Sequence, residues 1–211
     1  MGTVIYREYQ PEDFAALSDI VRVTWEHDKF CTPKIAVLLS DTYLRFCLAE
    51  QTFTRVAEFD GKAAGVIMGH NLRKTHGPLL FCLQAWQSLF RLSLSKEGRR
   101  AWKFFRKMDL IYEQLLADSS SVYQGELSFL AVRPDCRGRG IGKELFALFQ
   151  QYMEKENIKH YYVFTDTSCN YGFYESLNMQ QCGMQTLPYK QNNRLADCWV
   201  FIYENTERTG A

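Results

Sequence analysis

The sequence has no excess of charge of either sign. Among its 211 residues, 25 lysines and arginines stand against 24 aspartates and glutamates, which gives a formal net charge of +1. A protein dedicated to nucleic acid normally carries a clear basic excess, because contacts with phosphates dominate its affinity. We therefore expect no nucleic-acid partner.

The sequence also lacks a long apolar run. Its most apolar stretch, residues 79–94, is interrupted by Gln84, Gln87 and Arg91, whereas a transmembrane helix needs about 20 consecutive apolar residues. The chain does not open with a basic segment followed by an apolar core and a small-residue cleavage site. These absences lead us to expect a cytoplasmic protein with no membrane partner.

Spacing typical of a metal site is missing as well. The seven cysteines are widely spaced and include no Cys-x-x-Cys pair, and the four histidines form no ligand pattern. We expect no bound metal. We also expect the cysteines to be reduced, as they are in a reducing compartment.

The overall composition is that of an ordinary globular protein. Hydrophobic residues make up 46% of the chain and charged residues 23%, so the chain can bury a sizeable core. It contains no internal repeat, low-complexity tract or long flexible linker. We therefore expect one domain over residues 1–211.

The order of strand-like and helix-like segments predicts a mixed α/β fold. Strands are expected at 4–9, 52–59, 63–70, 126–132, 161–165 and 197–203. Helices are expected at 11–25, 33–46, 79–94, 102–116, 141–152 and 171–177, the third and fourth of them separated near Gly98. Asp60-Gly61 predicts a tight hairpin turn between two of the strands.

The most informative segment is a glycine-rich turn between a predicted strand and a predicted helix. Residues 132–142 read Val-Arg-Pro-Asp-Cys-Arg-Gly-Arg-Gly-Ile-Gly. A helix N-terminus leaves backbone N–H groups unbonded and attracts phosphate, and glycine lets the backbone approach closely. Arg137 and Arg139 add positive charge. The segment lacks the Gly-Lys-Ser/Thr end of a nucleoside-triphosphatase loop and the Gly-x-Gly-x-x-Gly spacing of a dinucleotide fold.

The spacing Arg137-x-x-Gly140-x-Gly142, after a strand that ends in Ala-Val-x-Pro, resembles the acyl-CoA-binding motif of the GNAT superfamily of N-acetyltransferases. The predicted order of elements is similar to that family's along most of the chain. The resemblance implies a mixed, mostly antiparallel central sheet flanked by helices. Residues 71–125 fall outside the shared pattern, so we expect a helical insertion between the third and fourth core strands. We expect it to pack on the sheet edge, and a lid over the acceptor site or a subunit interface is the alternative.

The resemblance implies that acetyl-CoA is the co-substrate. The pyrophosphate is expected on the backbone amides of the turn, those of Arg137, Gly138, Arg139, Gly140, Ile141 and Gly142. The pantetheine arm is expected along the preceding strand, on main-chain groups of Leu130, Ala131 and Val132. An N–H group there would also stabilise the tetrahedral oxyanion.

Two side chains are candidates for proton transfer. The family often places a tyrosine that protonates the leaving thiolate within Phe-Tyr-Glu, and residues 173–175 match, so Tyr174 is expected to be the general acid. Glu126 begins the strand before the turn, where several family members carry a base, and it is expected to accept the amine proton. Glu26 and Asp28, between the first two helices, are alternatives that would suit a cationic amine.

The sequence departs from the family pattern in two places. Many members have an asparagine seven residues before the tyrosine and an alanine four before it, where this chain has Thr167 and Asn170. We expect Asn170 or Thr167 to replace the usual asparagine contact with the cofactor arm. A later Gly-Phe pair is here Asn178-Met179, a mild change because asparagine tolerates a left-handed conformation.

Together these features predict an enzyme that transfers an acetyl group from acetyl-CoA to a primary amine by direct attack in a ternary complex. A small-molecule acceptor is favoured, because a long insertion could enclose a narrow pocket. Two alternatives are a protein lysine or N-terminal acetyltransferase and a non-catalytic acyl-CoA-binding sensor or assembly module. A homodimer is left open. A basic cluster either contacts an acidic partner or is a solvated helix face: Arg99, Arg100, Lys103, Arg106 and Lys107.

Overall fold

The structure is a computed structural model that describes residues 2–74, 79–191 and 194–205. Within these residues, seven strands form one sheet: β1 (Val4–Arg7), β2 (Phe53–Phe59), β3 (Lys62–Asn71), β4 (Gly125–Val132), β5 (Tyr161–Asp166), β6 (Met179–Gln191) and β7 (Arg194–Asn205). The α-helices are α1 (Phe14–Thr24), α2 (Pro33–Glu50), α3 (Leu79–Ser93), α4 (Lys96–Asp118), α5 (Ile141–Lys155) and α6 (Gly172–Ser176). Short 3-10 turns are η1 (Pro11–Asp13), η2 (His27–Lys29) and η3 (Pro134–Cys136).

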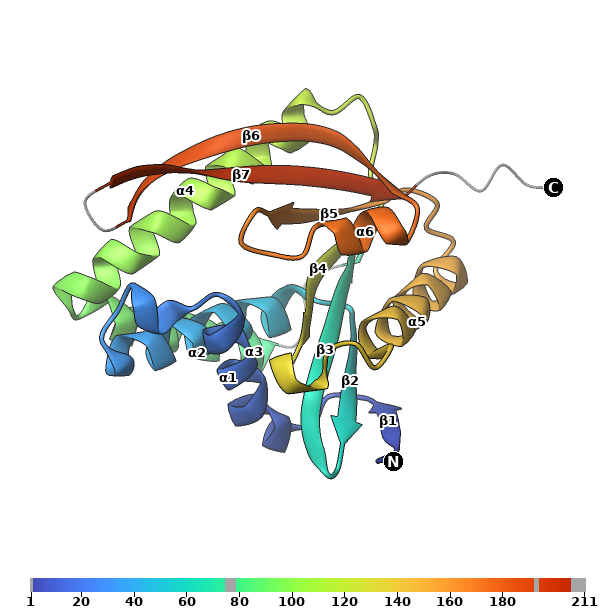
Figure 1. The fold of residues 1–211 in the computed structure, drawn as a ribbon, viewed down its shortest axis with the longest axis horizontal. Coiled ribbons are helices and arrows are strands. Elements are labelled where there is room, and N and C mark those ends of the chain that lie inside the picture. The colour runs from blue at the N-terminus through green and yellow to red at the C-terminus, as the bar shows by residue number, and fades with distance from the viewer. Residues whose placement is uncertain (1, 75–78, 192–193, 206–211) are drawn as a thin grey trace.

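The strands pair in the order β1-β2-β3-β4-β5-β7-β6 (Figure 1). Only β4 and β5 are parallel among these pairs in the described chain. Helices α3 and α4 lie between β3 and β4 in the sequence. The mixed, mostly antiparallel sheet with a helical insertion is therefore confirmed.

Two predicted backbone turns are present. Asp60 and Gly61, between β2 and β3, have φ angles of 52° and 71°, which fits the two left-handed positions of a tight hairpin turn. Asn178 has a φ angle of 60° at the end of α6, so asparagine takes the left-handed position that glycine usually fills.

Helices cover both faces of the sheet and bury two cores. On one face, α5 packs Leu145 and Phe149 against β3 and β4. On the other face, α1 and α2 bury Leu17 and Leu44 against the same strands, including Phe129 of β4. Figure 1 shows α5 on one side of these strands and α1 and α2 on the other. The strands that carry the candidate site are thus held from both sides.

The inserted helices pack on two different partners. Met108 and Leu115 of α4 are buried against Leu187, Val200 and Ile202 of the β6–β7 pair, as expected for packing on the sheet edge. Helix α3 packs mainly on α2. Within the insertion, α4 therefore covers part of the sheet, and α3 adds a helix to the layer that contains α2.

The two helices expected in this segment are present, but they separate at Leu94 and Ser95 and not at Gly98. Helix α4 already begins at Lys96, and the Gly98 N–H donates to the Ser95 side-chain oxygen at 2.8 Å, which makes Ser95 the N-cap. A Cβ atom at Gly98 would lie 2.0 Å from the Leu92 carbonyl oxygen. Glycine is therefore required there by the close approach of α3 and not by a helix end.

Strand β6 was not expected from the sequence. It carries several glutamines and Pro188, which weaken the alternating pattern of a strand. It lies at the edge of the sheet, and an edge strand tolerates proline because one of its sides needs no N–H donor.

Candidate active site

Strands β4 and β5 pair over a short distance and then separate. Gly125 lies opposite Tyr161 and Glu126 opposite Tyr162, and the described chain forms no further pair between the two strands. Both strands nevertheless continue, in the diverging directions visible in Figure 1. Beyond this point the facing edges of β4 and β5 are not joined to each other.

The register between β3 and β4 decides which main-chain groups face this separation. The Arg133 N–H donates to the Ala64 carbonyl oxygen at 2.7 Å, and bonded and non-bonded pairs alternate along an antiparallel ladder. Ala131 consequently bonds with β3, whereas the N–H and C=O groups of Leu130 and Val132 point away from β3. Two of the three residues expected along the pantetheine arm thus direct main-chain groups toward β5.

Ser128 forms a bulge in β4. Its neighbours Leu127 and Phe129 lie opposite consecutive residues of β3, so Ser128 has no partner of its own in the described ladder. Without an extra residue, positions three apart on a strand lie on opposite faces. The bulge therefore places Glu126 on the same face as Phe129, the face covered by α1 and α2.

The turn between β4 and α5 has the geometry of an anion-binding site. Gly138 and Gly140 adopt left-handed φ angles of 76° and 82°, which only glycine takes without strain. A Cβ atom at either position would meet nothing within 4 Å, so the backbone borders open space. Gly140 is the N-cap of α5 and no side chain caps the helix, which leaves its first N–H groups for a ligand. These residues fit a pyrophosphate group.

Arginine side chains add positive charge to this turn. Arg137 and Arg139 are exposed. The Arg137 Nε donates to the Val132 carbonyl oxygen at 3.1 Å, and the Arg139 guanidinium lies 4.9 Å from the centre of the Phe59 ring. The Arg137 main-chain N–H donates to the Pro134 carbonyl oxygen at 3.3 Å. The freer amide donors are therefore those that follow Arg137 in the chain.

Tyr174 lies in α6 and is buried. Its ring contacts Phe173 and Tyr203, with centroid distances of 5.5 Å and 6.1 Å. Burial, and to a smaller extent the Cys169 thiol, raise the pKa of Tyr174 well above its usual value. Its hydroxyl group therefore keeps its proton at neutral pH. A Cβ atom at Gly142 of α5 would lie 3.4 Å from the Phe173 ring, so α6 and the glycine turn are neighbours.

Glu126 occupies the first part of β4. Burial, followed by the nearby carboxylate of Glu50, raises the pKa of Glu126 to about 7, against a smaller opposing effect of the hydrogen bond with Tyr162. A carboxyl group with this pKa exchanges its proton near neutral pH. Such a group can act as a general base.

Cys169 lies close to Tyr174 and to one tyrosine each of α2 and α4. It belongs to the loop between β5 and α6, and its thiol interacts electrostatically with the hydroxyl groups of Tyr174, Tyr43 and Tyr112. Tyr43 of α2 also contacts Phe129, with ring centroids 5.9 Å apart. Tyr43 and Tyr112 stand in no motif, so helical spacing was the only sequence signal for either of them.

Asn170 and Thr167 occupy different positions beside the end of β5. The Thr167 N–H donates to the Trp199 carbonyl oxygen at 3.0 Å, and the Thr167 hydroxyl accepts from the Trp199 N–H at 3.3 Å. Thr167 is thus engaged with β7. Asn170 is exposed, and its carbonyl oxygen accepts from the Phe173 N–H at the start of α6. Its side chain is the better placed of the two for a ligand.

The alternative carboxylates between α1 and α2 already have cationic partners. Glu26 lies 2.7 Å from the Lys29 ammonium, and Asp28 lies 2.6 Å from the Arg22 guanidinium. Both carboxylates are well exposed. Neither lies in surroundings as buried as those that raise the pKa of Glu126.

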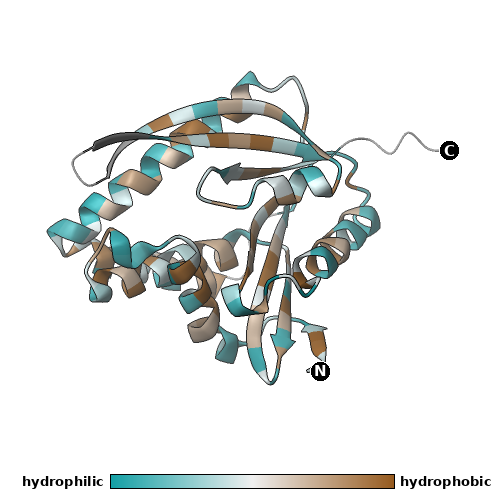
Figure 2. Ribbon diagram, in the orientation of Figure 1, coloured by the Kyte–Doolittle hydropathy of each residue, from teal (hydrophilic) through white to brown (hydrophobic). Residues whose placement is uncertain are grey.

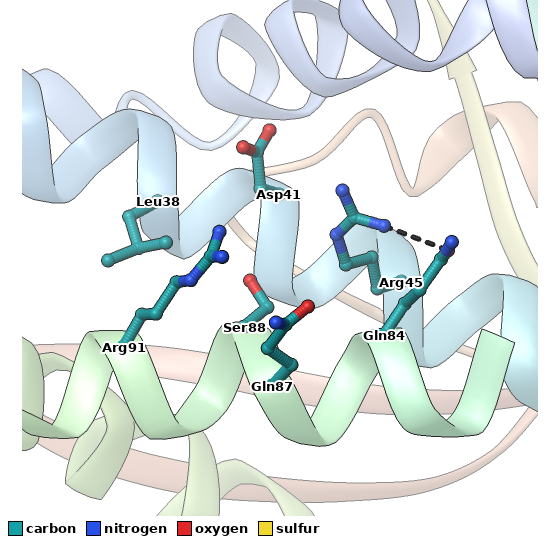
Figure 3. A pocket seen from close by; sticks show the side chains of 7 residues that line it. All are labelled: Leu38, Asp41, Arg45, Gln84, Gln87, Ser88 and Arg91. Atoms are coloured by element: carbon teal, nitrogen blue, oxygen red, sulfur yellow. Dashed lines mark hydrogen bonds between the residues drawn. The ribbon is translucent and has the colours of Figure 1, made fainter. Parts of the chain in front are cut away.

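Two hollows lie away from these residues. One, of about 140 Å³, opens between α2 and α3, where the Arg45 Nη1 donates to the Gln84 side-chain oxygen at 3.0 Å (Figure 3). Another, of about 240 Å³, is bordered by α1 and α2. Asp41 lines both, and neither includes the glycine turn, Glu126 or Tyr174.

The sequence model of the acetyltransferase (GNAT) family matches residues 14–179. No curated protein matches the chain.

Several solved structures share the fold. The chain is similar to PH1933 from Pyrococcus horikoshii OT3, with 14% identity, a TM-score of 0.60, and coverage of 98% of this chain and 99% of the other. It is similar to the ribosomal-protein-S18-alanine N-acetyltransferase from Escherichia coli, with 12% identity, a TM-score of 0.57, and coverage of 99% and 97%. It is also similar to the PaiA N-acetyltransferase from Thermoplasma acidophilum in complex with coenzyme A, with 14% identity, a TM-score of 0.52, and coverage of 96% and 98%.

Proposed function

Because the chain belongs to the GNAT family of acetyl-CoA-dependent acetyltransferases, we propose that it transfers the acetyl group to a primary amine of a small molecule, by direct attack in a ternary complex. The observation that carries the proposal is the separation of β4 from β5 directly beside the glycine turn. A strand edge whose Leu130 and Val132 N–H groups point away from β3 meets a helix N-terminus with free amides there. These are the two features that an extended acyl thioester with a pyrophosphate group requires.

The glycine turn holds the phosphate end of acetyl-CoA. The amides of Gly138, Arg139, Gly140, Ile141 and Gly142 face the anion, and the partial charge of the α5 N-terminus favours it. Main-chain groups of Leu130 and Val132 bind the arm as an added strand, and Asn170 contacts it from the loop before α6. An N–H group of this edge polarises the thioester carbonyl.

Glu126 takes the proton of the attacking amine. An amine is mostly protonated at neutral pH and must lose that proton before it can attack. The Glu126 carboxylate, with its pKa near 7, accepts the proton directly or through one water molecule. The amine nitrogen then forms a bond with the acetyl carbon. The second proton that the nitrogen loses as the amide forms passes to solvent, as does the proton held by Glu126.

Tyr174 protonates the leaving sulfur. When the carbon–sulfur bond breaks, the sulfur carries the electron pair and accepts the Tyr174 hydroxyl proton. The tyrosinate that remains regains a proton from solvent. Burial raises the pKa of Tyr174, so its hydroxyl group is protonated when the thiolate forms.

The acid and the base approach from different faces of the sheet. Tyr174 belongs to the core under α5, whereas the bulge at Ser128 turns Glu126 to the face under α1 and α2. This arrangement supports direct transfer, because the amine enters from one side of the β4–β5 separation and the sulfur leaves toward the other. A cysteine-bound acyl intermediate is not needed.

Aromatic side chains of the inserted helix α4 are the evidence for a small acceptor. Tyr112 of α4 stacks on Phe164 of β5 with ring centroids 4.2 Å apart, and Phe105 contacts Tyr43 of α2 at 6.1 Å. Aromatic side chains from the insertion thus stand beside the face that carries Glu126. They narrow the approach of a large acceptor more than that of a small one.

The test is the release of free thiol from acetyl-CoA across a mixed panel of small amines, polyamines, amino acids and peptides. Tyr174→Phe should lower kcat by about 100-fold or more without weakening cofactor binding, and Gly140→Trp should abolish binding. Tyr171→Phe is the matched control, since it removes a hydroxyl from the residue that precedes α6.

Each contrary result has a distinct meaning. Turnover on peptides alone would replace the small molecule by a protein acceptor. Tight acetyl-CoA binding that Gly140→Trp blocks, without thiol release on any amine, would identify a non-catalytic sensor. Equal activity of Tyr174→Phe and Tyr171→Phe would remove Tyr174 from the mechanism.

A further inference from the structure

Helix α3 and Leu94, the residue just beyond its end, expose a continuous apolar stripe. Its members recur at helical spacing, and each is between 61% and 78% exposed: Leu79, Leu80, Leu83, Trp86, Phe90 and Leu94. We call these residues the apolar stripe. The opposite side of the helix is buried, with Ser88 bonded to Thr42 of α2 at 2.8 Å. Large apolar patches are rare on the surface of a protein without a partner.

Helix α4 carries a basic face that begins where the apolar stripe ends. Its members share one exposed side of the helix: Lys96, Arg99, Arg100, Lys103, Arg106 and Lys107. The Arg99 Nη1 donates to the Ser93 carbonyl oxygen at 2.6 Å, so this cation lies beside the end of α3. The first turns of α4 are hydrophilic in Figure 2. The stripe and the basic face therefore adjoin.

Acidic residues are scarce in this part of the molecule. Helix α3 contains none, and Glu97 is the one acidic residue between 79 and 107. Its carboxylate accepts from the Thr32 N–H and hydroxyl at 2.7 Å and 2.8 Å, so it is directed to α2. Just beyond this stretch, the Asp109 carboxylate lies 3.4 Å from the Arg106 guanidinium. The surface is otherwise apolar and cationic, whereas the chain as a whole is almost neutral.

We propose that the apolar stripe of α3 and the basic face of α4 dock the protein onto the surface of an anionic lipid bilayer. Leucine, tryptophan and phenylalanine on one face of a helix, with lysines and arginines beside them, are what interfacial binding requires. The negative headgroups complement the basic face. No helix in the described residues is long and apolar enough to cross a membrane, so the docking is peripheral. This proposal revises the expectation of no membrane partner.

A second copy of the chain fits this surface less well. A two-fold contact presents the same surface on both subunits. The arginines and lysines that begin α4 would then face a surface that has the same sign of charge. The bilayer offers the opposite charge and also an apolar interior for the stripe.

The test is co-sedimentation of the full chain with vesicles. Phosphatidylcholine vesicles should retain little protein, and vesicles that also contain phosphatidylglycerol should retain much more, with a loss at high salt. Leu83→Ser together with Phe90→Ser should weaken binding more than about tenfold. Arg100→Gln together with Lys103→Gln should weaken it about tenfold or more.

Matched variants separate docking from general damage. Val122→Ser changes another exposed apolar residue, and Lys62→Gln together with Lys159→Gln removes two exposed cations elsewhere. These variants should bind like the wild type, and all variants should keep their unfolding temperature. Equal retention by both kinds of vesicle, or unchanged binding of the α3 variant, would overturn the proposal. So would a dimer that Leu83→Ser and Phe90→Ser dissociate, because α3 would then be an interface between copies.

Discussion

Burial acts in the same direction on Glu126 and Tyr174, with different consequences for catalysis. It raises the pKa of both groups by disfavouring their charged forms. For the carboxyl group this brings the pKa to about 7, so Glu126 exchanges its proton near neutral pH. For the phenol it moves ionisation away from neutral pH, so the Tyr174 hydroxyl group retains its proton.

The pH profile should depend on Glu126. A base must be deprotonated, so kcat/KM should rise as the pH increases through about 7. No fall due to Tyr174 is expected below pH 10, because its pKa lies above the usual value of about 10. Glu126→Gln should lower kcat/KM by about 100-fold and remove the rise near pH 7. The measurement is thiol release between pH 5 and about 9.

Glu50→Gln is the matched variant for this profile. The Glu50 carboxylate raises the pKa of Glu126, so its removal should shift the rising limb to lower pH while the plateau activity persists. An unmoved limb in Glu50→Gln, or one that persists in Glu126→Gln, would show that another group controls the profile.

Gly140→Ala should destabilise the protein and weaken cofactor binding. The φ angle of 82° is unfavourable for a residue with a Cβ atom by about 1 kcal/mol. Gly172→Ala is the control, because Gly172 lies in α6 without a left-handed φ angle and its nearest neighbour would be 3.9 Å away. Denaturant unfolding measures both variants. A free energy of unfolding that falls equally in the two would contradict the role of the φ angle.

At the scale of elements, the insertion joins two helices through one short connection. Leu94 and Ser95 separate α3 from α4, and the Ser95 side chain caps α4 while Gly98 allows the close approach to Leu92. The cap and the glycine together fix the angle between the helices. The position of Tyr112 and Phe105 beside the face that carries Glu126 depends on this angle.

Ser95→Ala should lower the free energy of unfolding by about 1 kcal/mol, because the Gly98 N–H loses its capping acceptor. The control is Ser93→Ala at the C-terminal end of α3. It removes a hydroxyl group that donates to the Phe90 carbonyl oxygen at 2.7 Å. It should change stability by no more than about 0.5 kcal/mol. Urea unfolding distinguishes the two, and equal losses would show that the cap adds nothing specific.

At the scale of the whole molecule, the sheet consists of two parts. Strands β1 to β4 form one part and β5, β7 and β6 the other, and in the described chain the two are linked by the pairs Gly125–Tyr161 and Glu126–Tyr162. A ligand bound along both edges would connect them. Stability should therefore respond to cofactor.

Coenzyme A at 100 times its Kd should stabilise the protein by about 2.7 kcal/mol, which raises Tm by several degrees. Hydrogen exchange should slow at Leu130 and Val132, whose main-chain groups face β5. Gly140→Trp should show neither effect. A Tm increase without added protection in β4 would place the ligand elsewhere.

The sequence was sufficient for the elements whose patterns are local. The Asp60-Gly61 turn, the helix that follows Gly140 and the strand that begins near Glu126 could be recognised from spacing and turn chemistry. Strand β6 could not, because its edge position permits polar residues and Pro188. The register of β4 could not be predicted either. The bulge at Ser128 determines on which face of the sheet Glu126 lies, and it arises from the pairing with β3, which the local sequence pattern does not reveal.

The same limit applies to the site. The glycine turn was recognisable because its φ angles demand glycine. Tyr43 and Tyr112 were not, because they approach Cys169 only after α2 and α4 have packed against each other. A functional role for Glu126 and Tyr174 is still a prediction, which the variants above test.

The β6–β7 pair extends well past the end of β5, which reaches only as far as Val200 along β7 (Figure 1). Its outer portion has no pairing with β5, and in the described chain helix α4 supports it through the contact of Leu115 with Leu187. Shortening or tilting α4 would move this outer portion while leaving the glycine turn unchanged. Sequence changes in α4 can therefore reposition the outer part of the β6–β7 pair without a change in the glycine turn.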